Sequence, residues 1–340
     1  MKVTDRRTFA DGRLEVTVFG LGCAALAGLF EAVPEPEARA TLDAAWDAGL
    51  RYFDTAPFYG YTRGERRVGA ALVRRPRGEL VLSTKVGRLM EPDDGVAAGS
   101  DGWADPLPWR PRFDYTYDGV MRSLEQSLHR LGLERVDILL VHDIGRLTHG
   151  ERHDLHWAQL TRGGGLRALE ELRRDGRIAA FGLGVNEFDV VRDAMQEARL
   201  DCTLLAGRHT LLEQRALDFL DACARDGNAI IIGGPFNSGV LAGDPKFDYG
   251  AAPPDVVRRA QALADACAEF DVPLQAAALQ FPTAHPAVVS CVAGARTAAQ
   301  LRQNVRWFEQ EIPPALWAAL RTRGLLDERA PCPGDPGARS

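Results

Sequence analysis

Eight short apolar segments, each followed by a longer amphipathic segment, run through nearly the whole chain and limit its fold more than any other feature. Strands are expected at residues 16–21, 51–54, 80–85, 136–141, 179–185, 202–206, 229–232 and 288–293. Helices are expected at residues 36–48, 64–73, 119–131, 165–174, 187–198, 212–225, 255–270, 275–281 and 297–308, where apolar residues recur at helical spacing. An unbroken series of such units predicts a parallel sheet covered by helices.

The expected strands are almost wholly apolar, as is typical of strands that are buried on both faces. Eight strand–helix units close into a barrel of about 250 residues, which insertions lengthen. We therefore predict an α/β fold, a single-domain (β/α)8 TIM barrel over residues 1–326. Residues 87–117 form an insertion after the third strand, and residues 327–340 are expected to be a disordered tail. Eight similar units without a linker disfavour the alternative, an open doubly wound sheet.

One motif favours a different fold. Residues 20–25 (GLGCAA) match the GxGxxA pattern of a Rossmann dinucleotide site. In that fold a helix opens directly at the glycines, and Pro34 and Pro36 prevent such a helix here. A barrel strand that ends in glycines is the better interpretation.

The composition excludes several functional classes. The formal net charge of −6 disfavours non-specific binding to nucleic acid or to anionic membranes. No apolar run approaches the roughly 20 residues of a membrane-spanning helix, and the first 16 residues are polar, without a signal-peptide core. The six cysteines are scattered and are expected to be reduced thiols. A cytoplasmic location is expected, and the sequence leaves the oligomeric state open.

Polar side chains follow four successive expected strands. Asp54 ends the second strand and Lys85 the third, while His142 follows the fourth and Asn186 the fifth. Barrel enzymes carry their catalytic groups at the C-terminal ends of the strands, so these side chains should converge on one rim. Tyr59 lies in the loop after Asp54, which is long enough to bring its hydroxyl over the barrel mouth.

These residue types predict a proton-relay site. The pKa of a free tyrosine, about 10, is too high for proton exchange at neutral pH. The ammonium of Lys85 should lower the pKa of Tyr59, and Asp54 should keep the buried Lys85 charged. His142 would donate an N–H to the substrate oxygen, and Tyr59 would act as general acid or base. No nucleophile or metal cage is evident, so a cofactor must carry the electrons.

The chain resembles the aldo-keto reductases over nearly its whole length. The resemblance lies in FDTAPFYG, STKVGR, VDILLVHD, FGLGVNEF and the closing GARTAAQLRQN. The Asp–Tyr spacing, with Lys and His on the next two strands, matches the family's catalytic tetrad. The resemblance therefore implies catalytic roles for Asp54, Tyr59, Lys85 and His142.

The resemblance also implies a dinucleotide site after the last strands. Residues 233–239 (GGPFNSG) and residues 294–304 are similar to the family's pyrophosphate and adenosine loops. Strand-end glycines and a following helix N-terminus offer free N–H groups to phosphate. The implied cofactor-binding residues are Asn186, His209, Gly234, Pro235, Phe236, Ser238, Gly294, Arg296, Gln300 and Asn304.

Three positions depart from the common family pattern. Val185 replaces a serine beside Asn186, and His209 stands where a tyrosine commonly stacks on the nicotinamide. Gln300 stands where NADP-preferring members usually carry an arginine that pairs with the 2′-phosphate, so NAD is compatible. Arg296 could still bind that phosphate, and the choice between NADP and NAD stays open.

The segment LAGRHTLLEQ resembles a branch that includes L-fucose, D-threo-aldose, L-galactose and pyridoxal dehydrogenases. The resemblance implies a small sugar or aldehyde substrate, most simply an aldose lactol that is oxidised to a lactone. The alternatives are a reductase or dehydrogenase of aldehydes such as pyridoxal, and a cofactor-sensing subunit without catalytic activity.

Aromatic residues are candidates for the substrate pocket: Phe58 beside Tyr59, and Trp103 and Trp109 in the insertion. The insertion either forms a wall of the site or packs as a surface flap. His149, His153 and His156 share one polar segment with Asp154. We interpret them as solvated loop residues, because nothing in the sequence implies a second shell for a zinc site, and we expect no metal.

Overall fold

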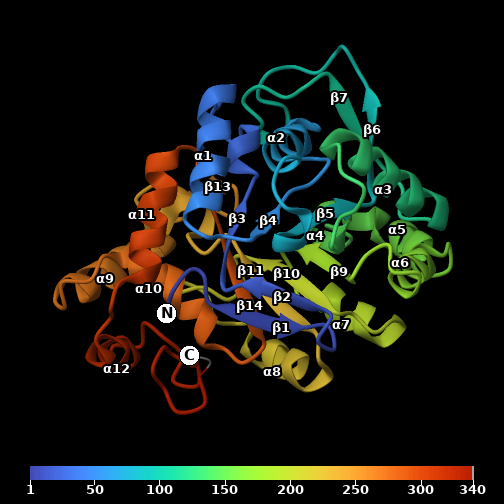
Figure 1. The fold of residues 1–340 in the computed structure, drawn as a ribbon. Helices are drawn as coiled ribbons and strands as arrows, with labels where there is room; N and C mark the ends of the chain where they lie inside the picture. Colours follow the sequence, from blue (N-terminus) through green and yellow to red (C-terminus); the bar gives the residue numbers. More distant parts are fainter. Residues whose placement is uncertain (339–340) are drawn as a thin grey trace.

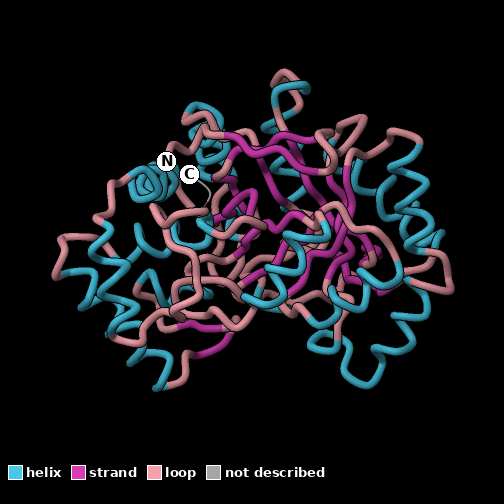
Figure 2. Tube along the Cα trace, turned by 90° about the horizontal axis from the view of Figure 1, so that it is seen from below, coloured by secondary structure: helices cyan, strands magenta, loops and turns pink. Residues whose placement is uncertain are grey.

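The computed structural model describes residues 1–338 and shows one closed barrel of eight parallel strands (Figures 1 and 2). The strands follow one another around the barrel in chain order, and the last pairs with the first. They are β3 (Phe19–Gly22), β4 (Tyr52–Asp54), β5 (Val81–Val86), β8 (Ile138–His142), β9 (Ala180–Val185), β10 (Cys202–Ala206), β11 (Ala229–Gly233) and β14 (Val288–Gly294). The predicted (β/α)8 barrel is confirmed.

Helices surround the barrel, as Figure 1 shows. They are α1 (Glu35–Asp47), α2 (Arg63–Leu72), α3 (Tyr117–Leu131), α6 (Gly165–Arg174), α7 (Asp189–Glu197), α8 (Leu217–Asp226), α9 (Pro254–Ala268), α10 (Leu274–Gln280) and α11 (Ala298–Glu309). Side chains alternate along each strand. In β8, Ile138 and Leu140 belong to a cluster inside the barrel, whereas Leu139 and Val141 join the cluster beneath the helices. This alternation explains why the strands are apolar on both faces.

An N-terminal hairpin extends the packing inside the barrel. It consists of β1 (Arg6–Phe9) and β2 (Leu14–Thr17), which pair antiparallel. Its apolar side chains join the same cluster as Ile138, and Arg7 donates to the carbonyl oxygens of Thr283 and Val288 at 2.8 Å each. The expected first strand, residues 16–21, is therefore two strands, because the apolar run continues through the bend between them.

The C-terminal segment packs on a second core that the sequence did not predict. Helix α12 (Pro314–Thr322) lies against α9, and both contribute to this core. Ala330 and Cys332 are buried in it, and Arg321 pairs with Asp335. Residues 327–338 thus have defined contacts, whereas we expected a disordered tail over residues 327–340, of which 339 and 340 lie outside the described residues.

The insertion after β5 forms a hairpin of β6 (Arg88–Pro92) and β7 (Trp109–Phe113), visible at the top of Figure 1. Two short helices, α4 (Arg146–His149) and α5 (His153–Leu160), follow β8. A two-residue ladder, β12 (Lys246–Phe247) with β13 (Gly250–Ala251), follows β11. All three insertions follow barrel strands and therefore lie on the side of the strands' C-terminal ends.

Other expected boundaries differ by a few residues. The helix expected at 212–225 begins only at Leu217, because Gln214 uses its side-chain amide to bond the carbonyls of Thr210 and Leu211 in the preceding loop. All six cysteines are free and buried. Across residues 1–338, no helix has both the length and the apolarity that crossing a membrane requires.

Candidate active site

The barrel brings the four predicted tetrad residues to one rim. Asp54 is the last residue of β4 and His142 the last of β8, while Lys85 is the penultimate residue of β5. Tyr59 lies in the loop that follows β4. Because all these strands run parallel, their C-terminal ends share one edge, and the side chains meet there.

Lys85 and Asp54 form a buried ion pair in which every donor of the ammonium is used. The Nζ atom lies 2.8 Å from Oδ2 and 3.0 Å from Oδ1 of Asp54, and it donates to the carbonyl oxygen of Thr55 at 2.9 Å. The hydroxyl of Ser83 donates to Oδ1 of Asp54 at 2.7 Å. The Lys85 and Asp54 side chains are only 2% and 4% exposed, so these bonds replace the water that both charges lose.

The Tyr59 ring lies close to both Lys85 and His142. The Nζ of Lys85 is 4.6 Å from the centroid of the tyrosine ring, and the Tyr59 and His142 ring centroids are 6.0 Å apart at 79°. The ring is half-buried, and its hydroxyl makes no hydrogen bond to any of residues 1–338. That hydroxyl is therefore available to a substrate.

The environment raises the pKa of Tyr59 well above its usual value, contrary to our expectation. Burial is the largest cause, and the carboxylates of Asp54 and Asp143 raise the pKa further. The guanidinium of Arg88 acts in the opposite direction and lowers the pKa of Tyr59. The site as described therefore favours a protonated Tyr59.

His142 is neutral near physiological pH. Burial lowers its pKa well below the usual value, and the positive charges of Arg88 and Lys85 lower it further. Its backbone carbonyl accepts a hydrogen bond from the Tyr115 hydroxyl at 2.7 Å, and Nε2 lies 3.4 Å from Oδ2 of Asp143. A neutral imidazole keeps one N–H with which to bind a substrate oxygen.

Aromatic side chains form a wall beside Tyr59. The ring of Trp103 lies 5.8 Å from that of Tyr59 and 5.6 Å from that of Phe58, centroid to centroid. Trp103 is 2% exposed, and backbone hydrogen bonds fasten its segment to residues 28–30, including Ala104 N to the Gly28 carbonyl at 2.9 Å. Trp109 is only partly buried against this cluster. The insertion thus forms one side of the mouth.

The predicted pyrophosphate residues follow β11. Gly234 is exposed, and a Cβ there would meet only the backbone N of Gly207, at 3.9 Å. Pro235 is buried and Phe236 half-buried, and Ser238 has a positive φ of 61°. Gly294 is exposed at the end of the neighbouring strand β14. Two exposed glycines at adjacent strand ends leave backbone open at the mouth, which fits a dinucleotide pyrophosphate.

The predicted adenosine residues begin helix α11. Gln300 is exposed and accepts a hydrogen bond from the Arg296 backbone N at 2.8 Å. Arg296 donates from Nη2 to the Leu29 carbonyl at 3.2 Å. Asn304 is buried and donates to the Gly294 carbonyl at 3.2 Å, so it shapes the loop.

Asn186 and His209 differ in their access to the mouth. Asn186 is half-buried, and its side-chain amide bonds Asp143 at 3.3 Å and the Tyr249 hydroxyl at 3.1 Å. His209 is fully buried, and its ring packs on Phe281 at 5.2 Å between centroids. The expectation that His209 stacks on the nicotinamide is wrong, because its ring points into the second core instead.

Three residues at the mouth were missed by sequence reasoning. They are Arg88, Asp143 and Tyr249. The charges of Arg88 and Asp143 shift the pKa of Tyr59, and Tyr59 in turn raises the pKa of Tyr249. Arg88 and Asp143 follow the ends of β5 and β8 by one or two residues. The rule of polar residues at strand ends would have found both if it had been extended that far.

The histidine segment after β8 is buried rather than solvated. His149, His153 and His156 are 5–6% exposed, and Nε2 of His149 bonds the Tyr115 hydroxyl at 2.9 Å. The expectation of solvated residues is wrong, because the insertion supplies Phe113 as an aromatic partner. Within residues 1–338, no group of three or more histidine, cysteine or acidic side chains is arranged to hold a metal ion.

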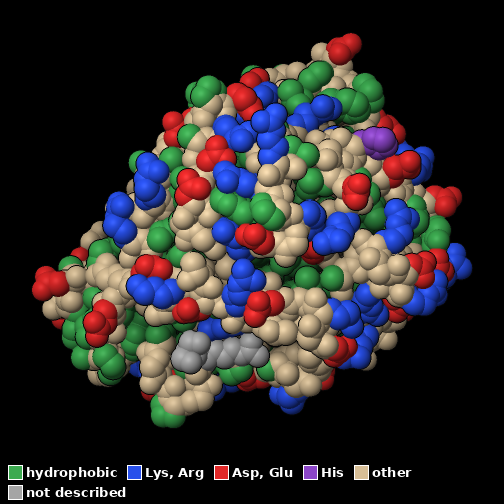
Figure 3. All heavy atoms as spheres, in the orientation of Figure 1, with side chains coloured by type: hydrophobic (Ala, Val, Ile, Leu, Met, Phe, Trp, Pro, Cys, Tyr) green, Lys and Arg blue, Asp and Glu red, His purple; other side chains and the backbone are tan. Residues whose placement is uncertain are grey.

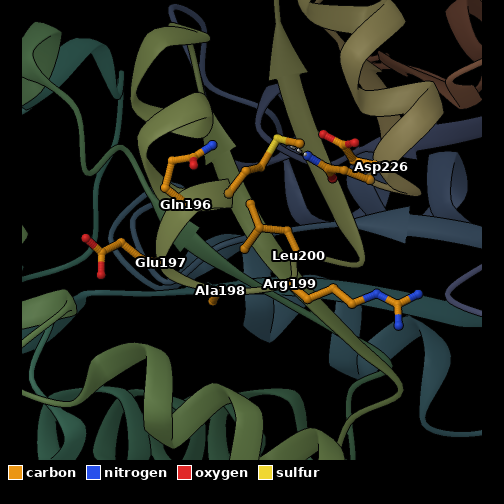
Figure 4. A pocket seen from close by; sticks show the side chains of 8 residues that line it. Gln196, Glu197, Ala198, Arg199, Leu200 and Asp226 are labelled. Atoms are coloured by element: carbon orange, nitrogen blue, oxygen red, sulfur yellow. Dashed lines mark hydrogen bonds between the residues drawn. The ribbon is translucent and has the colours of Figure 1, made fainter.

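A hollow of about 360 Å³ lies away from this site (Figure 4). It is lined by the end of α7, by residues 198–200 before β10, and by Asp226 and Asn228 before β11. These segments precede strands, so the hollow lies at the end of the barrel opposite to Tyr59.

Comparisons with known proteins agree with this geometry. Residues 18–322 match the model of the Aldo/keto reductase family. The chain is 49% identical to pyridoxal 4-dehydrogenase of Microbacterium luteolum and 41% identical to D-threo-aldose 1-dehydrogenase of a Pseudomonas species. Each alignment covers 96% of this chain and 99% of the relative. The solved structure of an aldo-keto reductase from Bacillus halodurans has a TM-score of 0.72 at 23% identity, over 95% of this chain and 97% of that one.

Proposed function

The chain belongs to the aldo/keto reductase family and is an NAD(P)-dependent oxidoreductase, and we propose that it oxidises a cyclic hemiacetal to a lactone. One observation carries this proposal: the Tyr59 ring contacts both the Lys85 ammonium of the Lys85–Asp54 ion pair and the ring of a neutral His142 at the barrel mouth. This arrangement supports a site in which a proton acceptor and a hydrogen-bond donor act on one substrate oxygen.

We assign the roles as follows. His142 donates its N–H to the hemiacetal hydroxyl oxygen and orients it. Tyr59 takes the proton from that hydroxyl as the C=O bond of the lactone forms, and it returns the proton in the reverse direction. Because the site favours the protonated phenol, Tyr59 must first lose its proton to solvent before it can accept one from the substrate. Lys85 stabilises the phenolate that results, while Asp54 keeps the ammonium charged and in place. The nicotinamide, when bound, supplies the hydride acceptor for the substrate C–H bond.

We propose an aromatic hemiacetal of the pyridoxal type as the preferred substrate. Pyridoxal carries a hydroxymethyl group beside its formyl group and closes to a hemiacetal, as aldoses do. The Phe58–Trp103 wall beside Tyr59 suits a flat ring, since aromatic rings pack edge-to-face or offset on one another. The relative at 49% identity is named for pyridoxal. This order reverses the sequence-based preference for aldoses, which stay the second candidate because of the relative at 41% identity.

We further propose that NAD is preferred over NADP. Arg296 is held by the Leu29 carbonyl and lies 3.5 Å from Oε2 of Glu31. The first turn of α11 is already capped, because Ala298 N donates to Oε1 of Glu37 at 3.1 Å and Gln300 N donates to Thr297 at 3.1 Å. The carboxylates of Glu31 and Glu37 therefore lie at this end of α11, where they would disfavour a 2′-phosphate.

A substrate screen tests both proposals. Reduced cofactor is followed at about 340 nm with pyridoxal, L-fucose, D-arabinose and galactose, each with NAD and with NADP. We expect the largest kcat/KM for pyridoxal with NAD. Tyr59→Phe should lower kcat by about 100-fold or more and leave the Kd for NADH unchanged. Faster turnover of aldoses than of pyridoxal would overturn the substrate proposal, and a preference for NADP would overturn the cofactor proposal.

A further inference from the structure

A second ion pair lies at the barrel mouth, outside the tetrad. Arg88 is the first residue of β6, and Asp143 directly follows His142. Nη2 of Arg88 donates to Oδ2 of Asp143, and the guanidinium carbon lies 4.0 Å from the centroid of the Phe58 ring. The Arg88 and Asp143 side chains are only 6% and 15% exposed. A pair this buried is weak evidence for stability, because desolvation offsets most of its attraction.

The backbone of Asp143 is held in an unusual conformation. Its φ is +47°, in the left-handed region where a residue other than glycine is uncommon. Its N–H donates to the Gly184 carbonyl of the neighbouring strand at 2.9 Å. Conformations of this kind concentrate at functional sites. Here the turn brings the Asp143 side chain back over the end of β8.

The carboxylate of Asp143 joins two residues of the proposed site. Oδ2 lies 3.4 Å from Nε2 of His142, and Oδ1 accepts a hydrogen bond from Nδ2 of Asn186 at 3.3 Å. His142 is expected to hold the substrate oxygen, and Asn186 the nicotinamide amide. The Asp143 side chain therefore contacts both His142 and Asn186, the residues expected to bind the two reactants, and Arg88 fixes the position of the Asp143 side chain.

We propose that Asp143, held by Arg88, is a positioning residue that sets the His142 ring and the Asn186 amide together. The proposal rests on the proposed function, because it assigns partners to groups that act in that reaction. It assigns no contact between Asp143 and either reactant.

The charge of Asp143 also acts on Tyr59. The charged and titratable groups around the carboxylate are Arg88, Lys85, His142, Tyr59 and Tyr249. Since the carboxylate raises the pKa of Tyr59, its neutralisation should lower that pKa. The limb of the pH–rate profile that reports Tyr59 should then move to lower pH, in both reaction directions.

Asp143→Asn tests the proposal with little risk to the fold. Asparagine has nearly the same size, and it adopts positive φ more readily than most residues. We expect kcat to fall by about 10- to 100-fold through misplacement of His142, with little change in KM. The Kd for NADH should rise by about threefold to tenfold as Asn186 loses its charged acceptor. The limb of the pH–rate profile that reports Tyr59 should move to lower pH by about half a pH unit or more.

Asp137→Asn is the matched control. Asp137 stands immediately before β8, as Asp143 stands immediately after it. It is also largely buried, pairs with Arg77 at 2.8 Å and accepts from the Leu82 backbone N at 2.8 Å. It lies at the opposite end of the barrel, so the control should lower the melting temperature without changing the Kd for NADH or the pH profile.

The outcomes separate a positioning role from a structural one. The proposal is overturned if Asp143→Asn leaves both the Kd for NADH and the pH profile unchanged, or if Asp137→Asn changes them equally. Failure of the wild-type enzyme to turn over any hemiacetal would overturn the proposed function alone. In that case the role of Asp143 can still be decided from the Kd for NADH of Asp143→Asn and Asp137→Asn, measured by protein fluorescence.

Discussion

Lys85 is the residue on which the site depends most, because it is a cation with almost no contact with water. Its ammonium is stabilised by Asp54 and the Thr55 carbonyl rather than by solvent. Removing one partner of such a pair leaves the other charge buried and uncompensated, which costs about 3–5 kcal/mol. Removing both charges avoids that penalty. The same pair therefore serves both folding and chemistry.

This dependence leads to a prediction about Lys85→Met. We expect the free energy of unfolding to fall by about 3 kcal/mol or more and kcat to fall by at least about 100-fold. The double variant Asp54→Asn/Lys85→Met should recover much of the stability but none of the activity. Urea denaturation and steady-state kinetics measure the two effects. Equal stability of the single and double variants would show that Asp54 is not left uncompensated.

At the scale of elements, the insertion between β5 and α3 determines one side of the mouth. Its first strand carries Arg88, and the segment that crosses to β7 carries Trp103. A backbone bridge pairs Trp103 with Leu29 in the loop after β3. The aromatic wall therefore depends on two loops that are distant in sequence.

The two tryptophans of the insertion provide a matched test of this wall. Trp103→Ala should raise KM for the preferred substrate by about tenfold and leave the Kd for NADH unchanged. Trp109→Ala, on the half-exposed hairpin strand, should change neither by more than about twofold. Steady-state kinetics and fluorescence titration measure these quantities. If both variants raise KM equally, Trp103 contributes no more to substrate binding than Trp109, and the prediction is contradicted.

At the scale of the whole molecule, three buried histidines couple stability to pH. Burial lowers the pKa of His142 well below its usual value, that of His149 to about 4 and that of His209 to about 3. In the unfolded chain each has a pKa of about 6.5. Below that pH the unfolded state binds more protons than the folded state, so stability falls as the pH falls.

We predict that the free energy of unfolding decreases from pH 7 to pH 5, by up to about 1.4 kcal/mol per pH unit for each of these histidines. His209→Phe should remove the contribution of one histidine from the slope of the free energy of unfolding against pH. Neither His209 ring nitrogen has a hydrogen-bond partner within residues 1–338, so the substitution breaks no hydrogen bond of the ring there. His129→Gln, a substitution of an exposed histidine, serves as the control. Urea denaturation at several pH values measures the slope. An unchanged slope in His209→Phe would mean that His209 titrates normally in the folded protein. A change in the Kd for NADH in His209→Phe would contradict the placement of His209 in the second core.

The face of the molecule drawn in Figure 3 carries charges of both signs. Figure 3 shows basic and acidic side chains interspersed over the face drawn, without a broad area of either sign. This agrees with the modest negative net charge of the sequence and provides no electrostatic basis for nucleic-acid binding on that face.

The sequence by itself determined the barrel and the position of three tetrad residues, Asp54, Lys85 and His142, on its rim. Buried parallel strands must be apolar on both faces, and their polar ends must share one edge, so Asp54, Lys85 and His142 could be located from local pattern alone. The N-terminal hairpin and helix α12 escaped prediction because their packing depends on contacts with residues far along the chain. For the same reason, residues 327–340 were expected to be a disordered tail.

Only the tertiary structure decided the electrostatics and the orientations. Whether Tyr59 gains or loses acidity depends on the sum of its burial and of the charges of Asp54, Asp143 and Arg88, and that sum varies with distance and burial. His209 illustrates the same limit, since its position along the chain matched a cofactor-stacking residue while its ring points into a core. Sequence spacing locates a residue on an element, whereas packing decides which way its side chain points.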